Sequence, residues 1–528
     1  MKKTLISLYY FIVIIIISSL NVSAETHNVL RRGVSGDPTT LDPHKILTAF
    51  ESTIMTDLFV ALATTSAEDK IIPGSAESWT ISEDGLKYTF KIRKNLKWSD
   101  GKPLSSYDFL YSLRRQVSPK TASRTVEYFR PIVNAQEIYK GTISVDKLGV
   151  YAPDPLTLII ELSYPAPYLM EILSIDGRPV PEHVIRKYGD SWIRPENIVV
   201  NGAFNLEEWV PGSFIKLKKN KMFYDADNVR LDNVYHIVVE DLNTGFRRFR
   251  AGEIDTLVLF PPEQLDFIKK NMPETLKIIP GLSTEFYIFN VKKKPFDDVR
   301  VRRALSMAID REVLVKKVLK TGEIPAYSYV PPTMNNYPNR PKASFSKLSM
   351  TERRKKAIKL LSSAGFDKNN TLVVPLRYNT QDLQSRQASA ISAMWKAIGV
   401  KTNLINTERK VLASDRANSN FSVARYLQVA GNYDATAFLL TLSRNLTARN
   451  FMQYDSENFN KLFLDAWHTN NITERNKKIY FAEEQAIIDH PMIPLYFYSS
   501  RRLIKPFVKG WVSNSRGVYP SRWVYIDR

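Results

Sequence analysis

Strand-like segments alternate with helical segments along nearly the whole chain, and this alternation is the feature that most constrains its fold. The strand-like segments are rich in β-branched and aromatic residues, and several alternate apolar with polar side chains as half-buried strands do. Strands interleaved with helices of ordinary length predict mixed α/β domains with partly parallel sheets. The predicted strands lie at 88–92, 156–162, 214–217, 235–239, 285–290, 372–378, 400–405 and 495–498.

Three of the predicted helices carry recognisable start or stop signals. Asp298 can cap a helix over 299–309, in which apolar residues recur at three- and four-residue spacing. A helix over 351–364 ends at Gly365, and a helix over 387–398 is followed by another glycine. Each of these helices is short enough to cross between neighbouring strands of one domain.

The chain is too long for a single hydrophobic core. Its 528 residues predict two or three packed units. No linker rich in glycine, serine or proline separates such units, and no repeat at a fixed period occurs. Separate domains must therefore be joined by short crossings, or by a chain that leaves one domain and returns to it.

The first residues have the organisation of an export signal. Two lysines precede a mostly apolar run from residue 5 to residue 20, and Val22, Ser23 and Ala24 then offer the small-x-small pattern of a cleavage site. We expect residues 1–24 to be removed, and the mature chain to insert into no membrane because no later run reaches spanning length. An uncleaved membrane anchor is the alternative, because the run approaches that length.

The chain contains no cysteine. This excludes disulfides, thiolate metal sites, a cysteine nucleophile and the lipid-modified cysteine that tethers many exported receptors. An exported and untethered protein of this kind is expected in the periplasm of a two-membrane bacterium, because a free protein would otherwise diffuse away.

The formal net charge is +20, but the basic residues do not form one dominant tract. Export argues against a nucleic-acid partner, whereas attraction to anionic envelope polymers stays open. The densest basic run, 353–356, begins a helix whose apolar face includes Ile358, Leu361 and Ala364. We therefore predict that this run lies on a solvated helix face.

The recognisable catalytic and cofactor motifs are missing from the sequence. None of the six histidines stands at metal-ligand spacing to another, and no HExxH, GxSxG, P-loop or GxGxxG occurs. His44 could serve as a base, but a loop residue that fixes local hydrogen bonds is the simpler interpretation. The sequence therefore predicts no enzyme, no metal site and no cofactor.

A series of short motifs carries a resemblance to a known family. It begins with Ala-Glu-Ser-Trp at 76–79 and continues with Trp-Ser-Asp-Gly-Lys-Pro at 98–103. In order along the chain, the motifs resemble the signature of the periplasmic oligopeptide-, dipeptide- and murein-peptide-binding proteins of ABC importers, which form extracellular solute-binding protein family 5. Further matches lie at 41–45, 88–93, 201–204, 252–255, 295–302, 308–311, 325–327, 421–425 and 502–506.

The resemblance implies a two-lobed α/β binding protein of class C, with an additional domain inserted in one lobe. The lobes close like a hinge on a peptide-like ligand. It further implies a monomer that delivers this ligand to an inner-membrane ABC permease. The expected divisions are a signal peptide at 1–24, lobe I at 25–59 with 184–284 and 499–528, domain II at 60–183, and lobe III at 285–498.

In this family the ligand lies extended between the lobes, and its backbone pairs with protein strands. Residue matching places those strands at 47–49 and 427–429, and it matches Arg416 and Arg425 to cationic residues of the cleft. Backbone pairing reads no side chain, so one receptor accepts many sequences. The ligand-binding residues that the resemblance implies are Leu47, Thr48, Ala49, Arg409, Arg416, Arg425, Leu427, Gln428, Val429 and Gly431.

Several of these positions depart from the family pattern. Gly431 stands where an aspartate pairs with the free amino group of the peptide. Gln428 and Arg409 replace tryptophans, and Leu47 replaces an acidic residue. Gln384 falls on a histidine that helps to hold the carboxylate of the peptide.

The missing aspartate bears on the ligand. A buried ammonium without a counter-charge is costly, and removing one partner of a buried pair typically costs about 3–5 kcal/mol. Either Asp434 or another carboxylate substitutes, or the preferred ligand is N-blocked, acidic or derived from murein. A local rearrangement of the chain is the other alternative. On the same fold, a sensor or envelope chaperone remains a further hypothesis.

Overall fold

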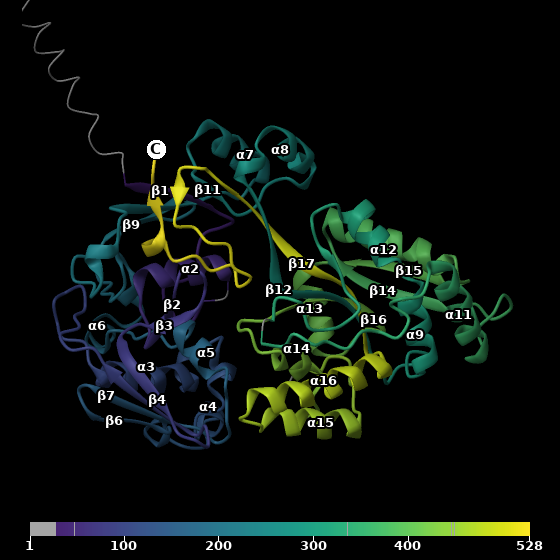
Figure 1. Ribbon diagram of the computed structural model, residues 1–528, viewed down its shortest axis with the longest axis horizontal. Helices are drawn as coiled ribbons and strands as arrows, with labels where there is room; N and C mark the ends of the chain where they lie inside the picture. The colour runs from purple at the N-terminus through teal and green to yellow at the C-terminus, as the bar shows by residue number, and fades with distance from the viewer. Residues whose placement is uncertain (1–27, 47, 335, 445, 448) are drawn as a thin grey trace, which may run out of the picture.

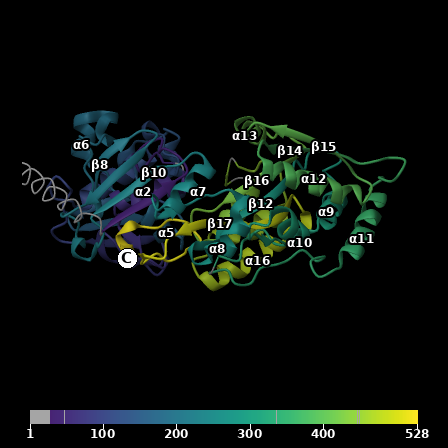
Figure 2. The same cartoon turned by 90° about the horizontal axis from the view of Figure 1, so that it is seen from above.

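The computed structural model describes residues 28–528 except 47, 335, 445 and 448, so the predicted signal peptide and Leu47 lie outside the described residues. Two bodies lie side by side and are joined by two long strands, β12 (Leu276–Phe289) and β17 (Met492–Ile504) (Figure 1). Figure 2 shows the same two bodies from above, with β12 and β17 between them. We call residues 28–275 with 505–528 the N-terminal body, and residues 290–491 the C-terminal body.

One large mixed sheet runs through both bodies. Its strand order is β15-β14-β16-β12-β17-β11-β1-β10-β9-β8, with β13 paired to β17 off this path. The pairs β1–β10, β1–β11, β14–β15 and β14–β16 are parallel and the others are antiparallel, which confirms the α/β prediction. The strands are β1 (Val29–Val34), β8 (Phe204–Val210), β9 (Phe214–Lys219), β10 (Asn233–Val238), β11 (Thr256–Leu257), β13 (Ile324–Pro325), β14 (Val373–Asn379), β15 (Lys401–Thr407) and β16 (Val423–Val429).

The N-terminal body contains a second, antiparallel sheet with the order β4-β5-β7-β6. Helix α3 packs against β6 and β7 of this sheet. The N-terminal body also contains two separate two-stranded sheets, β2 with β3 and β18 with β19. The elements are β2 (Ala63–Thr65), β3 (Ile71–Pro73), β4 (Ala76–Ile81), β5 (Lys87–Ile92), β6 (Val150–Asp154), β7 (Thr157–Glu161), β18 (Val508–Lys509), β19 (Tyr525–Ile526), α2 (Ala49–Leu58), α3 (Ser106–Val117), α4 (Ala135–Tyr139), α5 (Leu169–Ile175), α6 (Glu182–Tyr188), α7 (Leu242–Ala251) and α8 (Leu265–Asn271).

In the C-terminal body, helices cover the sheet. Helix α12 packs on β14 and β15, and α15 pairs with α16 below the sheet in the view of Figure 1. The helices are α9 (Val299–Ala308), α10 (Arg311–Val313), α11 (Met350–Ser363), α12 (Asp382–Lys396), α13 (Arg409–Ala417), α14 (Thr436–Leu439), α15 (Glu457–Trp467) and α16 (Ile472–Asp489).

Two of the predicted helices begin or end at the signals found in the sequence. Asp298 is the N-cap of α9, and its side chain accepts a hydrogen bond from the Arg300 N–H. Helix α11 ends just before Gly365, whose φ of 90° is a left-handed conformation that glycine adopts readily. The third helix differs from the prediction, because α12 begins at Asp382, five residues before 387.

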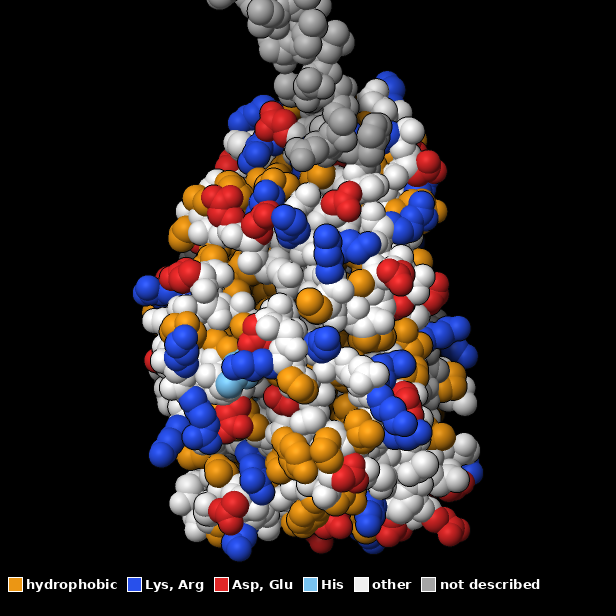
Figure 3. All heavy atoms as spheres, turned by 90° about the vertical axis from the view of Figure 1, so that its left-hand side faces the viewer, with side chains coloured by type: hydrophobic (Ala, Val, Ile, Leu, Met, Phe, Trp, Pro, Cys, Tyr) orange, Lys and Arg blue, Asp and Glu red, His pale blue; other side chains and the backbone are white. Residues whose placement is uncertain are grey.

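The sequence suggested that the basic run at 353–356 lies on a solvated helix face, and this prediction is wrong at Arg353. Arg353 is buried, and its guanidinium donates hydrogen bonds to the carbonyl oxygens of Phe345 and Ser346. Ile358 is instead 49% exposed. The helix therefore turns its first arginine inward, because the loop before it offers carbonyl acceptors. Elsewhere basic and acidic side chains intermingle, as one face of the N-terminal body shows (Figure 3).

Phe90 and Trp98 are fully buried core residues of the N-terminal body. The interpretation of His44 as a loop residue is confirmed. His44 is a buried loop residue, because its Nε2 lies 3.1 Å from the Arg178 carbonyl oxygen and its Nδ1 lies 2.8 Å from Arg115. Burial lowers the pKa of His44 to about 4, so the imidazole is neutral. In the described part of the chain, no helix is long and apolar enough to cross a membrane.

Candidate functional site

Strand β16 has an open edge between the two bodies. Strand β14 pairs with only the first two residues of β16, whereas β12 pairs with all of it. The Ala430 N–H donates to the Leu282 carbonyl oxygen. Because bonding directions alternate along an antiparallel pair, Leu427 and Val429 point their N–H and C=O groups away from β12. This edge can accept an added strand.

A small cavity lined by both apolar and polar side chains lies beside the open edge, and Glu127, Arg130 and Arg449 are its charged lining residues. Its volume is about 90 Å³, and it lies between the two bodies. Gly431 faces the same cavity, and a Cβ atom at this position would lie 3.2 Å from the Tyr128 hydroxyl oxygen. Aromatic and aliphatic side chains from both bodies form much of its wall, including Tyr128, Tyr168, Ile172, Tyr426, Leu440 and Trp467.

The positive charge of Arg425 is neutralised inside the protein. Its Nε and Nη2 atoms lie 2.7 and 2.8 Å from the two carboxylate oxygens of Glu285, which is 1% exposed. This bidentate pair is the strong form of an arginine–carboxylate contact. The Arg425 Nη1 donates to Asn379 at 3.0 Å. Arg425 is thus held in place below the open edge and brings little uncompensated charge to a ligand.

Arg416 fixes the beginning of the open edge. Its Nη1 donates to the Arg425 carbonyl oxygen at 2.9 Å, and its guanidinium lies 5.4 Å from the centre of the Tyr426 ring. Burial lowers the pKa of Arg416. Arg409 lies exposed at the first position of α13. Of the three predicted arginines, Arg416 and Arg425 are in contact with each other, whereas Arg409 is exposed.

The two glutamines at departures from the family pattern are both buried. Gln428 turns into the C-terminal body and donates to the carbonyl oxygens of Ala437 and Phe438. Gln384 lies on α12, and its Oε1 is buried with no hydrogen-bond partner in the described residues. An unpaired buried acceptor costs free energy, so Gln384 is suited to receive a donor from a ligand or a water molecule.

Asp434 is already engaged by a cation of the protein. Its carboxylate lies 3.1 Å from the Arg475 guanidinium, and the two side chains are 4% and 0% exposed. It also accepts from the Thr436 N–H at 2.9 Å. A carboxylate that is paired in this way is a poor counter-charge for a ligand ammonium. Asp434 is therefore engaged within the protein, as its contacts with Arg475 and Thr436 show.

The prediction that 47–49 forms a pairing strand is wrong at Ala49, which is the first residue of helix α2. Thr48 is the extended N-cap of this helix, and it exchanges hydrogen bonds with Glu51 in a capping box. The helix thus begins where a strand was expected. Both Thr48 and Ala49 remain exposed.

Sequence reasoning missed a polar contact that joins the two bodies. Tyr433 of the C-terminal body donates its N–H to Glu171 at 2.6 Å and its hydroxyl to Asp69 at 2.6 Å. Arg516 of the C-terminal segment lies 3.3 Å from Asp69 and 3.6 Å from Glu171. Burial raises the pKa of both carboxyl groups. Tyr433 is 262 positions from Glu171 and 364 from Asp69, so no local pattern could have paired them.

The described residues offer no group of three or more His, Cys, Asp or Glu side chains that could hold a metal ion. The site presents a row of backbone donors and acceptors, a small cavity of mixed apolar and polar lining, and buried charges that compensate each other. Two α/β bodies, two crossing strands and a free strand edge between them define a two-lobed binding protein.

Comparison with known proteins agrees with this class. Residues 70–450 match the family of bacterial extracellular solute-binding proteins, family 5. The chain is 37% identical to the periplasmic oligopeptide-binding protein OppA of Salmonella typhimurium, covering 91% of this chain and 89% of that protein. It is also 37% identical to the probable deoxycholate-binding periplasmic protein YgiS of Escherichia coli, covering 96% and 95%.

Solved structures give the same result. The murein tripeptide binding protein MppA of Escherichia coli superposes with a TM-score of 0.83 at 33% identity, over 96% of this chain and 99% of that one. Haemophilus influenzae OppA, in complex with the peptide RPPGFSPFR, superposes with a TM-score of 0.81 at 31% identity, over 96% and 100%. The chain belongs to the bacterial extracellular solute-binding proteins of family 5.

Proposed function

We propose that this protein is a periplasmic receptor that captures oligopeptides between its two bodies and delivers them to an inner-membrane ABC importer. The observation that carries the proposal is the open edge of β16, where Leu427 and Val429 offer backbone donors and acceptors to the space between the bodies. Relatives that bind oligopeptides and murein peptides support it. Binding and release, and no turnover, is the activity we propose.

The proposal includes the organisation of the chain. We propose cleavage after residue 24, lobe I at 25–59 with 184–284 and 499–528, domain II at 60–183 and lobe III at 285–498. In this division β12 and β17 are the hinge strands. The receptor is proposed to act as a monomer, with Arg409, Arg416, Leu427 and Gly431 among its ligand-binding residues.

A second ligand class is favoured by the surroundings of Gly431. Asp434 of the C-terminal body is paired with Arg475, and the carboxylate that lines the same cavity as Gly431 in the described residues is the exposed Glu127 of the N-terminal body. A peptide whose amino group is blocked, or a murein-derived peptide, avoids the cost of an unpaired ammonium. An acidic preference has less support, because Glu285 compensates Arg425. Because the chain is also similar to a protein described as a probable deoxycholate-binding protein, we count a non-peptide anion among the candidate ligands.

The test is mass spectrometry of the small molecules released when periplasmically purified protein is denatured. The same protein is then titrated calorimetrically with matched peptides that have free or acetylated amino groups. A mixture of free peptides supports the general receptor, whereas blocked or sugar-bearing species support the second class. Absence of any peptide from the released material, together with no heat of binding for either series, would contradict both.

A further inference from the structure

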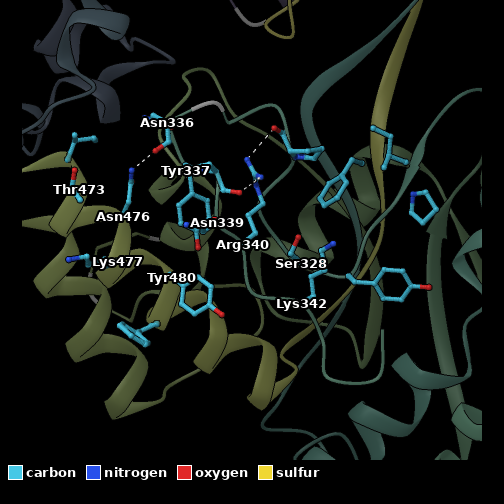
Figure 4. Close-up of a pocket in the computed structure, with 18 residues that line it drawn as sticks. Ser328, Asn336, Tyr337, Asn339, Arg340, Lys342, Thr473, Asn476, Lys477 and Tyr480 are labelled. Atoms are coloured by element: carbon cyan, nitrogen blue, oxygen red, sulfur yellow. Dashed lines mark hydrogen bonds between the residues drawn. The ribbon is translucent and has the colours of Figure 1, made fainter. Parts of the chain in front are cut away.

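A large hollow lies apart from the cleft between the bodies. It lies within the C-terminal body, between residues 324–342 and the first half of α16, and its volume is about 1250 Å³ (Figure 4). Strand β13, at its edge, pairs with β17 through Ile324 and Phe497. Because β12 and β17 lie between β13 and β16, this hollow is separate from the open edge of β16.

The wall opposite α16 is held firmly by its own hydrogen bonds. The Arg340 guanidinium donates to four carbonyl oxygens of its own loop, including those of Pro332 and Pro338. Tyr337 donates its hydroxyl to the buried Glu483 at 2.9 Å. Asn476 of α16 donates to the Asn336 carbonyl oxygen and so ties the two walls together. The hollow is therefore built into the fold before any ligand arrives.

The chemistry of the lining is aromatic and cationic. Tyr480 and Phe481 project from α16, and their rings meet edge to face with centroids 5.7 Å apart. Phe481 is 52% exposed, which is unusual for a side chain of this size unless something covers it. Further apolar surface comes from Ile324, Pro325, Tyr327, Pro332, Tyr337 and Phe497.

The charges of the lining have one sign. Arg340, Lys342 and Lys477 line the hollow, and none of the described residues that line it is an aspartate or glutamate. Lys477 forms a surface ion pair with Glu474 at 2.8 Å. Lys342 is exposed and makes no ion pair within the described residues. Burial raises the pKa of Glu483, beneath Tyr337, to about 7, so this carboxyl offsets the cations only in part.

An unsatisfied polar atom adds a further requirement. The Asn336 side-chain oxygen is buried at the wall of the hollow with no hydrogen-bond partner in the described residues. Such an atom accepts a hydrogen bond at little cost and is expensive to leave unpaired. A ligand that carries a hydroxyl or N–H group next to its apolar body would satisfy it.

We propose that this hollow is a second binding site, which takes a small organic anion with an aromatic or alicyclic ring system. The anionic group lies near Lys342 and Arg340, the ring system contacts Tyr480 and Phe481, and a donor reaches Asn336. The volume exceeds what a drug-sized molecule needs. This site goes beyond the proposed peptide function, and it can be occupied while a peptide is held between the bodies.

The probe for the test is 8-anilinonaphthalene-1-sulfonate, a sulfonate with an aromatic ring system and an N–H group. Its fluorescence is titrated with the full mature protein, alone and with a saturating oligopeptide. We expect one saturable site whose Kd changes less than about two-fold when peptide is present. Phe481→Ala and Lys342→Glu are each expected to weaken binding by about three- to ten-fold, since both are exposed and their loss leaves the fold intact.

Two controls keep the test specific to this hollow. Ile488→Ala removes a side chain of the same helix that is 58% exposed but lies outside the lining, and Lys461→Glu reverses an exposed charge on α15. Both are expected to change the Kd less than two-fold. Absence of a saturable site, displacement of the probe by peptide, or equal effects of control and test variants would each overturn the proposal. A crystal structure of the complex with the probe bound elsewhere would overturn it as well.

Discussion

The Tyr433 hydroxyl donates a hydrogen bond of 2.6 Å to the carboxylate of Asp69, and this contact joins the C-terminal body to the N-terminal body. The Tyr433 ring also lies 5.0 Å from the Arg516 guanidinium, which approaches the same carboxylate. A contact of this kind exists only when the two bodies are together. It therefore favours the closed arrangement independently of any ligand.

We expect Tyr433→Phe to weaken ligand binding by about ten-fold. The substitution removes a hydrogen bond to a charged group that is made only in the closed arrangement, and about 1.4 kcal/mol corresponds to a ten-fold change in Kd. The measurement is calorimetric titration with the released ligand, together with the radius of gyration of the free protein in solution, which should rise.

A matched control is available within one body. Tyr454 donates its hydroxyl to Asp489 at 2.6 Å inside the C-terminal body. Tyr454→Phe is expected to lower the free energy of unfolding but to leave the Kd and the radius of gyration unchanged. Equal effects of the two substitutions on ligand affinity would show that the Tyr433 contact does not act through closure.

Gly431→Asp is expected to create a preference for free amino groups. A carboxylate beside the open edge gives a ligand ammonium a partner, and the affinity ratio of free over acetylated peptide should rise by ten-fold or more. The Tyr128 hydroxyl lies 3.2 Å from the new Cβ, so the variant is best made together with Tyr128→Phe. Gly431→Asn, which has nearly the same size without the charge, should leave the ratio unchanged. A ratio that rises equally with asparagine would point to shape alone.

Much of the fold was predictable because its signals are local. The alternation at 88–92 and the Asp298 cap depend on neighbouring residues, and both elements formed where expected. The start of α2 also had a local signal, since Thr48 and Glu51 have the spacing of a capping box. The strand expected there came from residue matching, which outweighed this signal and was wrong at Ala49.

The charges of the site were not predictable in the same way. Arg425 and Glu285 are 140 positions apart, and only the register of β12 against β16 brings them together. Arg353 looked like a surface residue because its partners are carbonyl oxygens, which carry no sequence signal. Sequence therefore indicated which charges occur near the cleft, but not which of them are already compensated.

We expect Arg425→Met to lower the free energy of unfolding by about 3–5 kcal/mol. The change leaves the Glu285 carboxylate buried without its partner, which costs far more than the pair itself contributes. Urea denaturation measures the loss, and the double variant Arg425→Met with Glu285→Gln should recover a large part of it. Arg377→Met is the control, because its pair with Asp415 is more exposed and is expected to contribute less than about 1 kcal/mol. A double variant no more stable than Arg425→Met alone would show that the loss comes from packing.

Asp176 is expected to make the stability of the protein depend on pH. Burial raises the pKa of this carboxyl from its ordinary value of 3.8 to about 6, and the more distant Arg178 and Arg516 oppose the shift only in part. No hydrogen bond or ion pair engages the carboxylate within the described residues. The folded state therefore binds more protons than the unfolded state between these two pKa values. The free energy of unfolding consequently falls as pH rises from about 4 to about 6, and it stays low at higher pH.

Asp176→Asn should remove this dependence and raise the free energy of unfolding at pH 7 by up to about 3 kcal/mol, while the two proteins converge near pH 4. Urea denaturation across this range measures the effect, and Glu127→Gln, which changes an exposed carboxylate that lines the cavity beside Gly431, should follow the unsubstituted protein. Parallel pH profiles for Asp176→Asn and the unsubstituted protein would mean that the carboxylate is solvated in solution and carries no such strain.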